Sequence, residues 1–128
     1  MNHEPIHAAM RELSAFPGVV GCAVVDAATG MSWYHAGVLP QLERFGEAAV
    51  EFWRVQVRLG SYFAELGPPQ SAAFSFSDSV VALFPCCTDP ALVLVCVTNR
   101  KDVQWGLWAQ PVASLKQHLA QIAKADRM

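Results

Sequence analysis

The segment from Phe16 to Gly30 constrains the fold of this chain more than any other. A Pro17-Gly18 break precedes a run of small and β-branched residues, Val19–Asp26, and a turn that contains Gly30 leads into Met31–Ala36. Such a run, with Pro-Gly before it and a glycine turn after it, is typical of a strand that continues into a hairpin. The sequence therefore predicts the end of a helix, a first strand and a tight hairpin.

The same signals divide the rest of the chain. A first helix is predicted to begin at Pro5, where the missing N–H costs nothing, and a long second helix is predicted over Leu42–Leu66. Alternating and apolar runs predict three further strands, over Ser71–Phe76, Val80–Phe84 and Ala91–Val97. The last of these is apolar along nearly its whole length, which is typical of a central strand covered on both faces.

Proline decides the expected end of the chain. A proline inside a helix removes one backbone hydrogen bond and costs about 3 kcal/mol. We therefore expect a turn over Val103–Gln110 and a regular last helix from Pro111 to Lys124. The resulting order, α-β-β-α-β-β-β-α, in 128 residues indicates one small α+β domain that spans residues 1–128.

The composition indicates protein partners. Hydrophobic residues make up 53% of the chain and charged residues 16%, which is more apolar surface than a small domain buries by itself, and a subunit interface is the usual place for the surplus. A net charge of −2 argues against binding of nucleic acid, which needs a clustered basic face. No apolar run approaches the roughly 18 residues of a membrane helix, and the first residues do not resemble a signal peptide. We expect a cytoplasmic protein.

The sequence contains few candidates for catalytic or metal-binding residues. The four cysteines lack the spacing of a metal site and are expected to be small buried hydrophobes, although Cys86-Cys87 follows Pro85 in a predicted loop, where one thiol could be exposed. The segment from His3 to His7 matches the zinc-protease pattern by letter, but its internal Pro5 and its place at the chain end make this a chance match. We predict no catalytic residue, cofactor or metal site, and expect that the chain is not an enzyme.

The predicted second helix is unusual in the width of its apolar surface. When residues are placed at about 100° intervals, the charged side chains fall on one narrow stripe: Glu43, Arg44, Glu47, Glu51, Arg54, Arg58 and Glu65. The remaining apolar arc is roughly twice as wide as one sheet covers. Either another helix of the same chain packs alongside, or the helix meets its own copy across a two-fold axis, which is the commonest oligomeric arrangement. We favour the second interpretation.

Gln56 lies near the middle of this apolar arc. Buried polar groups need hydrogen-bond partners, so Gln56 could bond its symmetry mate and fix the register of a dimer, as single polar residues do in coiled coils. It could equally lie at the rim and reach water or a backbone carbonyl. The side chains predicted for the dimer contact are Phe45, Ala49, Phe52, Trp53, Gln56 and Phe63.

Three segments resemble the Roadblock family, the fold shared by roadblock-type dynein light chains and bacterial mutual-gliding B proteins. They are Phe16–Gly21 with Asp26 and Gly30, the helix around Ala49–Trp53, and Leu92–Asn99. The resemblance extends from about Ile6 to Ile122. It implies a profilin-like, five-stranded antiparallel sheet with helices on both faces, a homodimer, and no catalytic residues of its own.

The resemblance also implies a role in binding or regulating a small Ras-like GTPase, with activation of that GTPase as one form of regulation. The paired second helices would form the docking surface, and its contacts are predicted at Glu47, Glu51, Arg54 and Arg58. The alternative is a ligand-sensing or structural dimerisation subunit on the same fold, with a pocket near Trp33, His35 and Trp105. It could also pair with another Roadblock chain.

Overall fold

The computed structural model describes residues 2–99 and 105–126. Its elements follow the predicted order: α1 (Glu4–Ser14), β1 (Val19–Asp26), β2 (Ser32–Gly37), α2 (Leu42–Arg58), the 3₁₀ helix η1 (Gly60–Leu66), β3 (Ala72–Ser75), β4 (Val80–Thr88), β5 (Ala91–Thr98) and α3 (Trp105–Asp126). The α+β class and the α-β-β-α-β-β-β-α order are confirmed.

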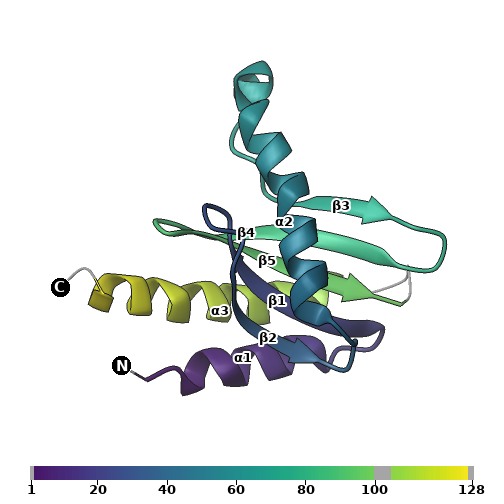
Figure 1. Cartoon of the computed structure of the whole chain (residues 1–128). Helices are drawn as coiled ribbons and strands as arrows, with labels where there is room; N and C mark the ends of the chain where they lie inside the picture. Colours follow the sequence, from purple (N-terminus) through teal and green to yellow (C-terminus); the bar gives the residue numbers. More distant parts are fainter. Residues whose placement is uncertain (1, 100–104, 127–128) are drawn as a thin grey trace.

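The five strands form one antiparallel sheet in the order β2-β1-β5-β4-β3. Helices α1 and α3 lie side by side on one face, and α2 crosses the other (Figure 1). The apolar run of β5 occupies the centre of the sheet and is buried after its first residue, so the prediction of a central, doubly covered strand is confirmed. The edge strands are β2 and β3.

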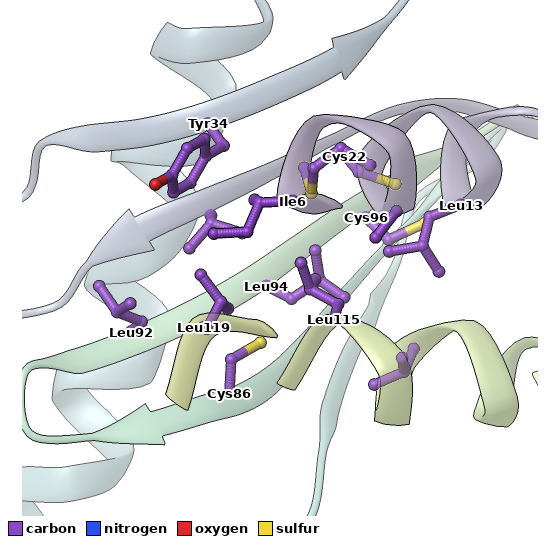
Figure 2. Close-up of a cluster of buried hydrophobic side chains, with 14 of the residues drawn as sticks. Ile6, Leu13, Cys22, Tyr34, Cys86, Leu92, Leu94, Cys96, Leu115 and Leu119 are labelled. Atoms are coloured by element: carbon purple, nitrogen blue, oxygen red, sulfur yellow. The ribbon is translucent and has the colours of Figure 1, made fainter. Parts of the chain in front are cut away.

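Two hydrophobic clusters fill the space on either side of the sheet. The larger lies between the sheet and helices α1 and α3, where Ile6, Leu13, Leu94, Leu115 and Leu119 meet (Figure 2). The smaller lies under α2 and consists of Ala23, Val25, Ala49, Val50, Trp53, Leu83, Val93 and Val95. Among residues 2–99 and 105–126, a single α-helix therefore covers the second face, whereas two cover the first.

The predicted hairpin is present, and side-chain hydrogen bonds fix its turn. Asp26 is buried, and its carboxylate accepts hydrogen bonds from the backbone N–H groups of Ala28 (2.8 Å) and Thr29 (3.2 Å). Gly30 then takes a φ of +79°, which favours glycine. Asp26 therefore holds the turn of the hairpin through its side chain.

Three predicted boundaries are wrong. The α-helical part of the second helix ends at Arg58 instead of Leu66, because Gly60 follows it and glycine weakens a helix. Strand β4 continues through Pro85 to Thr88 instead of ending in a loop, because a bulge between Pro85 and Cys87 accommodates a residue without an N–H.

The third correction concerns the last helix. Residues 105–110 are helical, so the predicted turn is wrong there, and the rest of that turn lies outside the described residues. Pro111 is inside α3. The turns that follow it bury Val112, Leu115 and Leu119 in the larger cluster, and this burial offsets the missing hydrogen bond. None of the helices in the described part of the chain is both long and apolar enough to cross a membrane.

Candidate protein interface on helix α2

Helix α2 presents three different faces. The first is buried against the sheet and carries Leu42, Gly46, Ala49, Val50 and Trp53. At Gly46 the helix comes so close to β1 that an added Cβ would lie 3.1 Å from the side chains of Ala23 and Val25. A larger residue there would push the helix off the sheet, so Gly46 sets the depth at which α2 lies.

The second face, which we call the apolar face, is exposed. It carries Phe45, Ala48, Phe52, Val55 and Leu59, and Phe45 and Phe52 are 48% and 41% exposed. Among the described residues no other helix lies beside it, because α1 and α3 cover the opposite face of the sheet (Figure 1). The interpretation that a second helix of the same chain covers the wide apolar arc is therefore wrong for the part of the chain that the structure describes.

A hollow of about 650 Å³ runs between the apolar face and the sheet. Its walls are mainly hydrophobic and include Phe45, Phe52, Phe76, Val81 and Val97. Phe52 stacks on Phe74 of the edge strand β3, with 4.2 Å between ring centroids and 26° between ring planes. The apolar face therefore continues from α2 onto the sheet, next to the free edge of β3.

Beyond β3 the chain projects from the sheet as an arm, residues 57–66 (Figure 1). Tyr62 and Leu66 are 81% and 82% exposed. Beneath the arm is a hollow of about 600 Å³, lined by Gln56, Val57, Gly60, Phe63, Leu66, Gly67, Pro68, Pro69 and Ser71. No strand of the described chain lies outside β3 to fill it.

The third face of α2 is charged, and part of it already has partners within the chain. Arg54 is half-buried: its Nε donates a hydrogen bond to the carbonyl of Ala27 (2.6 Å), and its guanidinium pairs with Glu51. The guanidinium also lies over Gly30 in the hairpin turn. Arg54 therefore fastens the β1–β2 hairpin to α2.

The other charged side chains of this face are more accessible. Glu43 pairs with His35 of β2 at 2.8 Å. Glu47 and Arg58 are exposed, and Glu51 is exposed although it pairs with Arg54. The residues predicted for the partner contact therefore share one face, but they differ in exposure and in whether they already bond within the chain.

The residues predicted for the dimer contact divide between two faces. Phe45, Phe52 and Phe63 are exposed, but Ala49 and Trp53 are buried in the cluster between α2 and the sheet of their own chain. The helical projection could not separate these groups, because it shows which residues are apolar and not where the sheet lies. The contact predicted from the sequence also omits other exposed apolar residues of this region: Val55, Leu59, Tyr62, Leu66 and Phe76.

The structure does not bring together the residues predicted for the alternative ligand pocket, Trp33, His35 and Trp105. Trp33 lines a cavity of about 170 Å³ with Leu92 of β5 and Leu119 of α3. His35 is not part of this cavity and pairs with α2 instead. The side chain of Trp105 lies outside the described residues.

The cysteines and His3 have surroundings that are typical of packing and hydrogen bonding in a folded domain. Cys22, Cys86 and Cys96 are buried, and Cys87 is half-buried. Burial raises the pKa of the Cys86 thiol to about 12. His3 is hydrogen-bonded through Nδ1 to the hydroxyl of Tyr34 at 2.6 Å. Within residues 2–99 and 105–126 no three His, Cys, Asp or Glu side chains are grouped so that they could hold a metal ion.

Comparison with solved structures gives the fold. A Roadblock/LC7 domain from Streptomyces avermitilis superposes with a TM-score of 0.75 at 12% identity, covering 91% of this chain and 95% of that one. The gliding protein MglB from Thermus thermophilus gives a TM-score of 0.75 at 16% identity over 96% of this chain and 91% of that one. Myxococcus xanthus MglB gives 0.72 at 13% identity over 97% and 91%. The chain has the Roadblock fold, as its resemblance predicted.

Sequence comparison adds nothing to this result. No protein-family model matches the sequence, and no curated protein matches it either.

Proposed function

We propose that this protein is a non-catalytic regulatory or scaffold module that forms a homodimer through α2 and binds a small Ras-like GTPase. The observation that carries the proposal is the exposed apolar face of α2, which continues onto the edge of the sheet. The similarity to MglB structures supports a regulatory role, because proteins with this fold include gliding proteins.

The dimer follows from the position of the apolar face. Exposed apolar patches of this kind mark interaction sites, and a two-fold partner presents the same patch in return. Strand β3 is the edge of the sheet next to the apolar face. No strand of the described chain pairs with its outer side, so the backbone groups on that side can pair with a strand of another chain. A second copy can extend the sheet at β3 while its α2 packs on the apolar face. Phe45, Phe52, Gln56 and Phe63 form the core of this proposed contact.

The proposed GTPase contact uses the charged face of α2. Its support is the Roadblock fold together with the mixed charges of Glu47, Glu51 and Arg58, which are exposed. Arg54 belongs to the same face and contributes its outer edge while it holds the hairpin. Mixed charges on an exposed face favour specific recognition of a partner with a complementary pattern.

The first experiment is a pull-down of the tagged protein from the lysate of its own source, once with a GTP analogue and once with GDP. We expect a Ras-like GTPase to be enriched with the GTP analogue. The double variant Glu47→Arg with Arg58→Glu should lose this enrichment and keep the dimer, as measured by light scattering. Enrichment of no GTPase in either nucleotide state would contradict the regulatory proposal and leave a structural dimerisation subunit.

A further inference from the structure

Gln56 has a buried hydrogen-bond acceptor without a partner. In the described part of the chain only two buried side-chain atoms have no hydrogen-bond partner, the Ser32 hydroxyl oxygen and Oε1 of Gln56. An unsatisfied buried acceptor is rare in native structures because its lost solvation is not replaced. Oε1 of Gln56 therefore indicates a donor that this chain does not supply.

The position of Gln56 on α2 indicates from which side of the molecule a donor could approach. It follows Phe52 by four residues and Trp53 by three, so it lies on the border between the apolar face and the face buried on the sheet. It also lines the hollow beneath the arm, together with Ser71, which directly precedes β3. Part of the side chain therefore borders the space outside the sheet edge, although Oε1 itself is covered in the single chain.

The position of Gln56 relative to β3 can be estimated along the helix. Phe52 stacks on Phe74 of β3, and four residues advance the helix by about 6 Å, which places Gln56 at the outer side of this edge strand. If two copies pair at β3, the strands lie about 4.8 Å apart, so the two-fold axis passes about 2.4 Å outside β3. Gln56 of each copy then stands close to that axis.

We propose that Gln56 lies at the two-fold axis and pairs with the partner's Gln56; this inference rests on the proposed homodimer. When the two copies meet, each carboxamide swings out of its covered position toward the axis and donates one N–H from Nε2 to Oε1 of the other, so neither acceptor is left buried without a partner. The site is incomplete in one chain, and the second copy supplies the missing donor.

The pair gives the dimer a single register. The apolar face repeats large residues at helical spacing, Phe45, Phe52, Val55 and Leu59, and such a face can slide along its copy by one turn with little loss of apolar contact. A slide of one turn would separate the two carboxamides and leave two unsatisfied acceptors. Gln56 therefore selects the arrangement in which the edges of β3 also meet.

The first test is a cross-link in the full-length chain. Gln56→Cys is made in a Cys87→Ser background, because Cys87 is the half-buried native thiol, and Glu47→Cys on the charged face is the matched control. Under mild oxidation with copper phenanthroline we expect most of the Gln56→Cys chains to form a disulfide-linked dimer, with position 56 bonded to position 56 by peptide mapping. Little of the control should be linked.

The second test changes the charge at the same position. Gln56→Glu brings two carboxylates together at the axis and should raise the dimer dissociation constant at least tenfold in sedimentation. Gln117→Glu, the same change on the exposed side of α3, should leave it unchanged. A wild-type dimer that gives no cross-link at position 56 and tolerates Gln56→Glu would overturn the inference and leave the homodimer intact. A monomeric wild-type protein would overturn both.

Discussion

Val55 gives the sharpest test of the apolar face. It is 42% exposed, lies on that face, and belongs to neither hydrophobic cluster. Truncation of valine to alanine removes two carbon atoms, each of which contributes about 0.8 kcal/mol when buried, so covering their exposed part contributes about 0.7 kcal/mol in each copy. A two-fold interface uses the residue twice. Val55→Ala should therefore weaken the dimer by about 1.4 kcal/mol, which raises the dissociation constant roughly tenfold.

The measurement is a concentration series in sedimentation velocity, with thermal unfolding as a check on the fold. Val38→Ala is the matched control, because Val38 is 86% exposed in the loop before α2 and is not part of the apolar face. Val55→Glu should leave only monomer in the micromolar range, because it adds the cost of burying a charge in each copy. If Val55→Ala dimerises as tightly as wild type, or if Val38→Ala weakens the dimer equally, the apolar face is not the contact.

Three further predictions concern the folded chain. Leu115→Ala should lower the free energy of unfolding by about 2–5 kcal/mol in urea titrations, because Leu115 is fully buried and its truncation leaves a cavity; a loss below about 1 kcal/mol would contradict this packing. In the native protein at pH 8, Ellman's reagent should modify Cys87 first and spare Cys86, whose pKa of about 12 keeps it protonated until well above that pH; peptide mapping that finds Cys86 modified first would contradict its burial. Arg54→Ala removes the charged hydrogen bond to the Ala27 carbonyl and should destabilise the chain by about 1–3 kcal/mol, with faster amide exchange in the β1–β2 turn; unchanged exchange would mean that Arg54 does not fasten the hairpin.

Most of the fold could be predicted from the sequence because its signals are local. The predicted bounds of β1 are correct, since Gly18 before the strand and Gly30 after it both take positive φ angles that favour glycine. The central position of β5 could be predicted from its continuous apolar run. These features depend on residues close to one another along the chain.

Two of the three wrong boundaries depend on contacts between distant residues, whereas the early end of α2 has a local cause in Gly60. Pro111 is tolerated in α3 because Leu115 and Leu119 are buried against other elements, and Pro85 is tolerated in β4 because the pairing with β5 contains a bulge. Local propensity cannot show either compensation. The same holds for the candidate site. The width of the apolar arc could be predicted from the sequence, but the burial of Trp53 between α2 and the sheet depends on where the sheet lies, which the helical pattern does not show.

The two proposed contacts can be occupied together because they use different faces of one helix. At about 100° per residue, Phe45 and Phe52 lie to one side of the buried face, whereas Glu47 and Arg58 lie on the other side and away from the sheet. Two copies that meet through their apolar faces therefore keep both charged faces exposed. A GTPase partner would then meet two charged faces held at a fixed distance by the dimer. Variants that break the dimer without touching the charged face, such as Phe45→Glu, should consequently weaken GTPase binding as well, whereas Arg58→Glu should weaken GTPase binding alone.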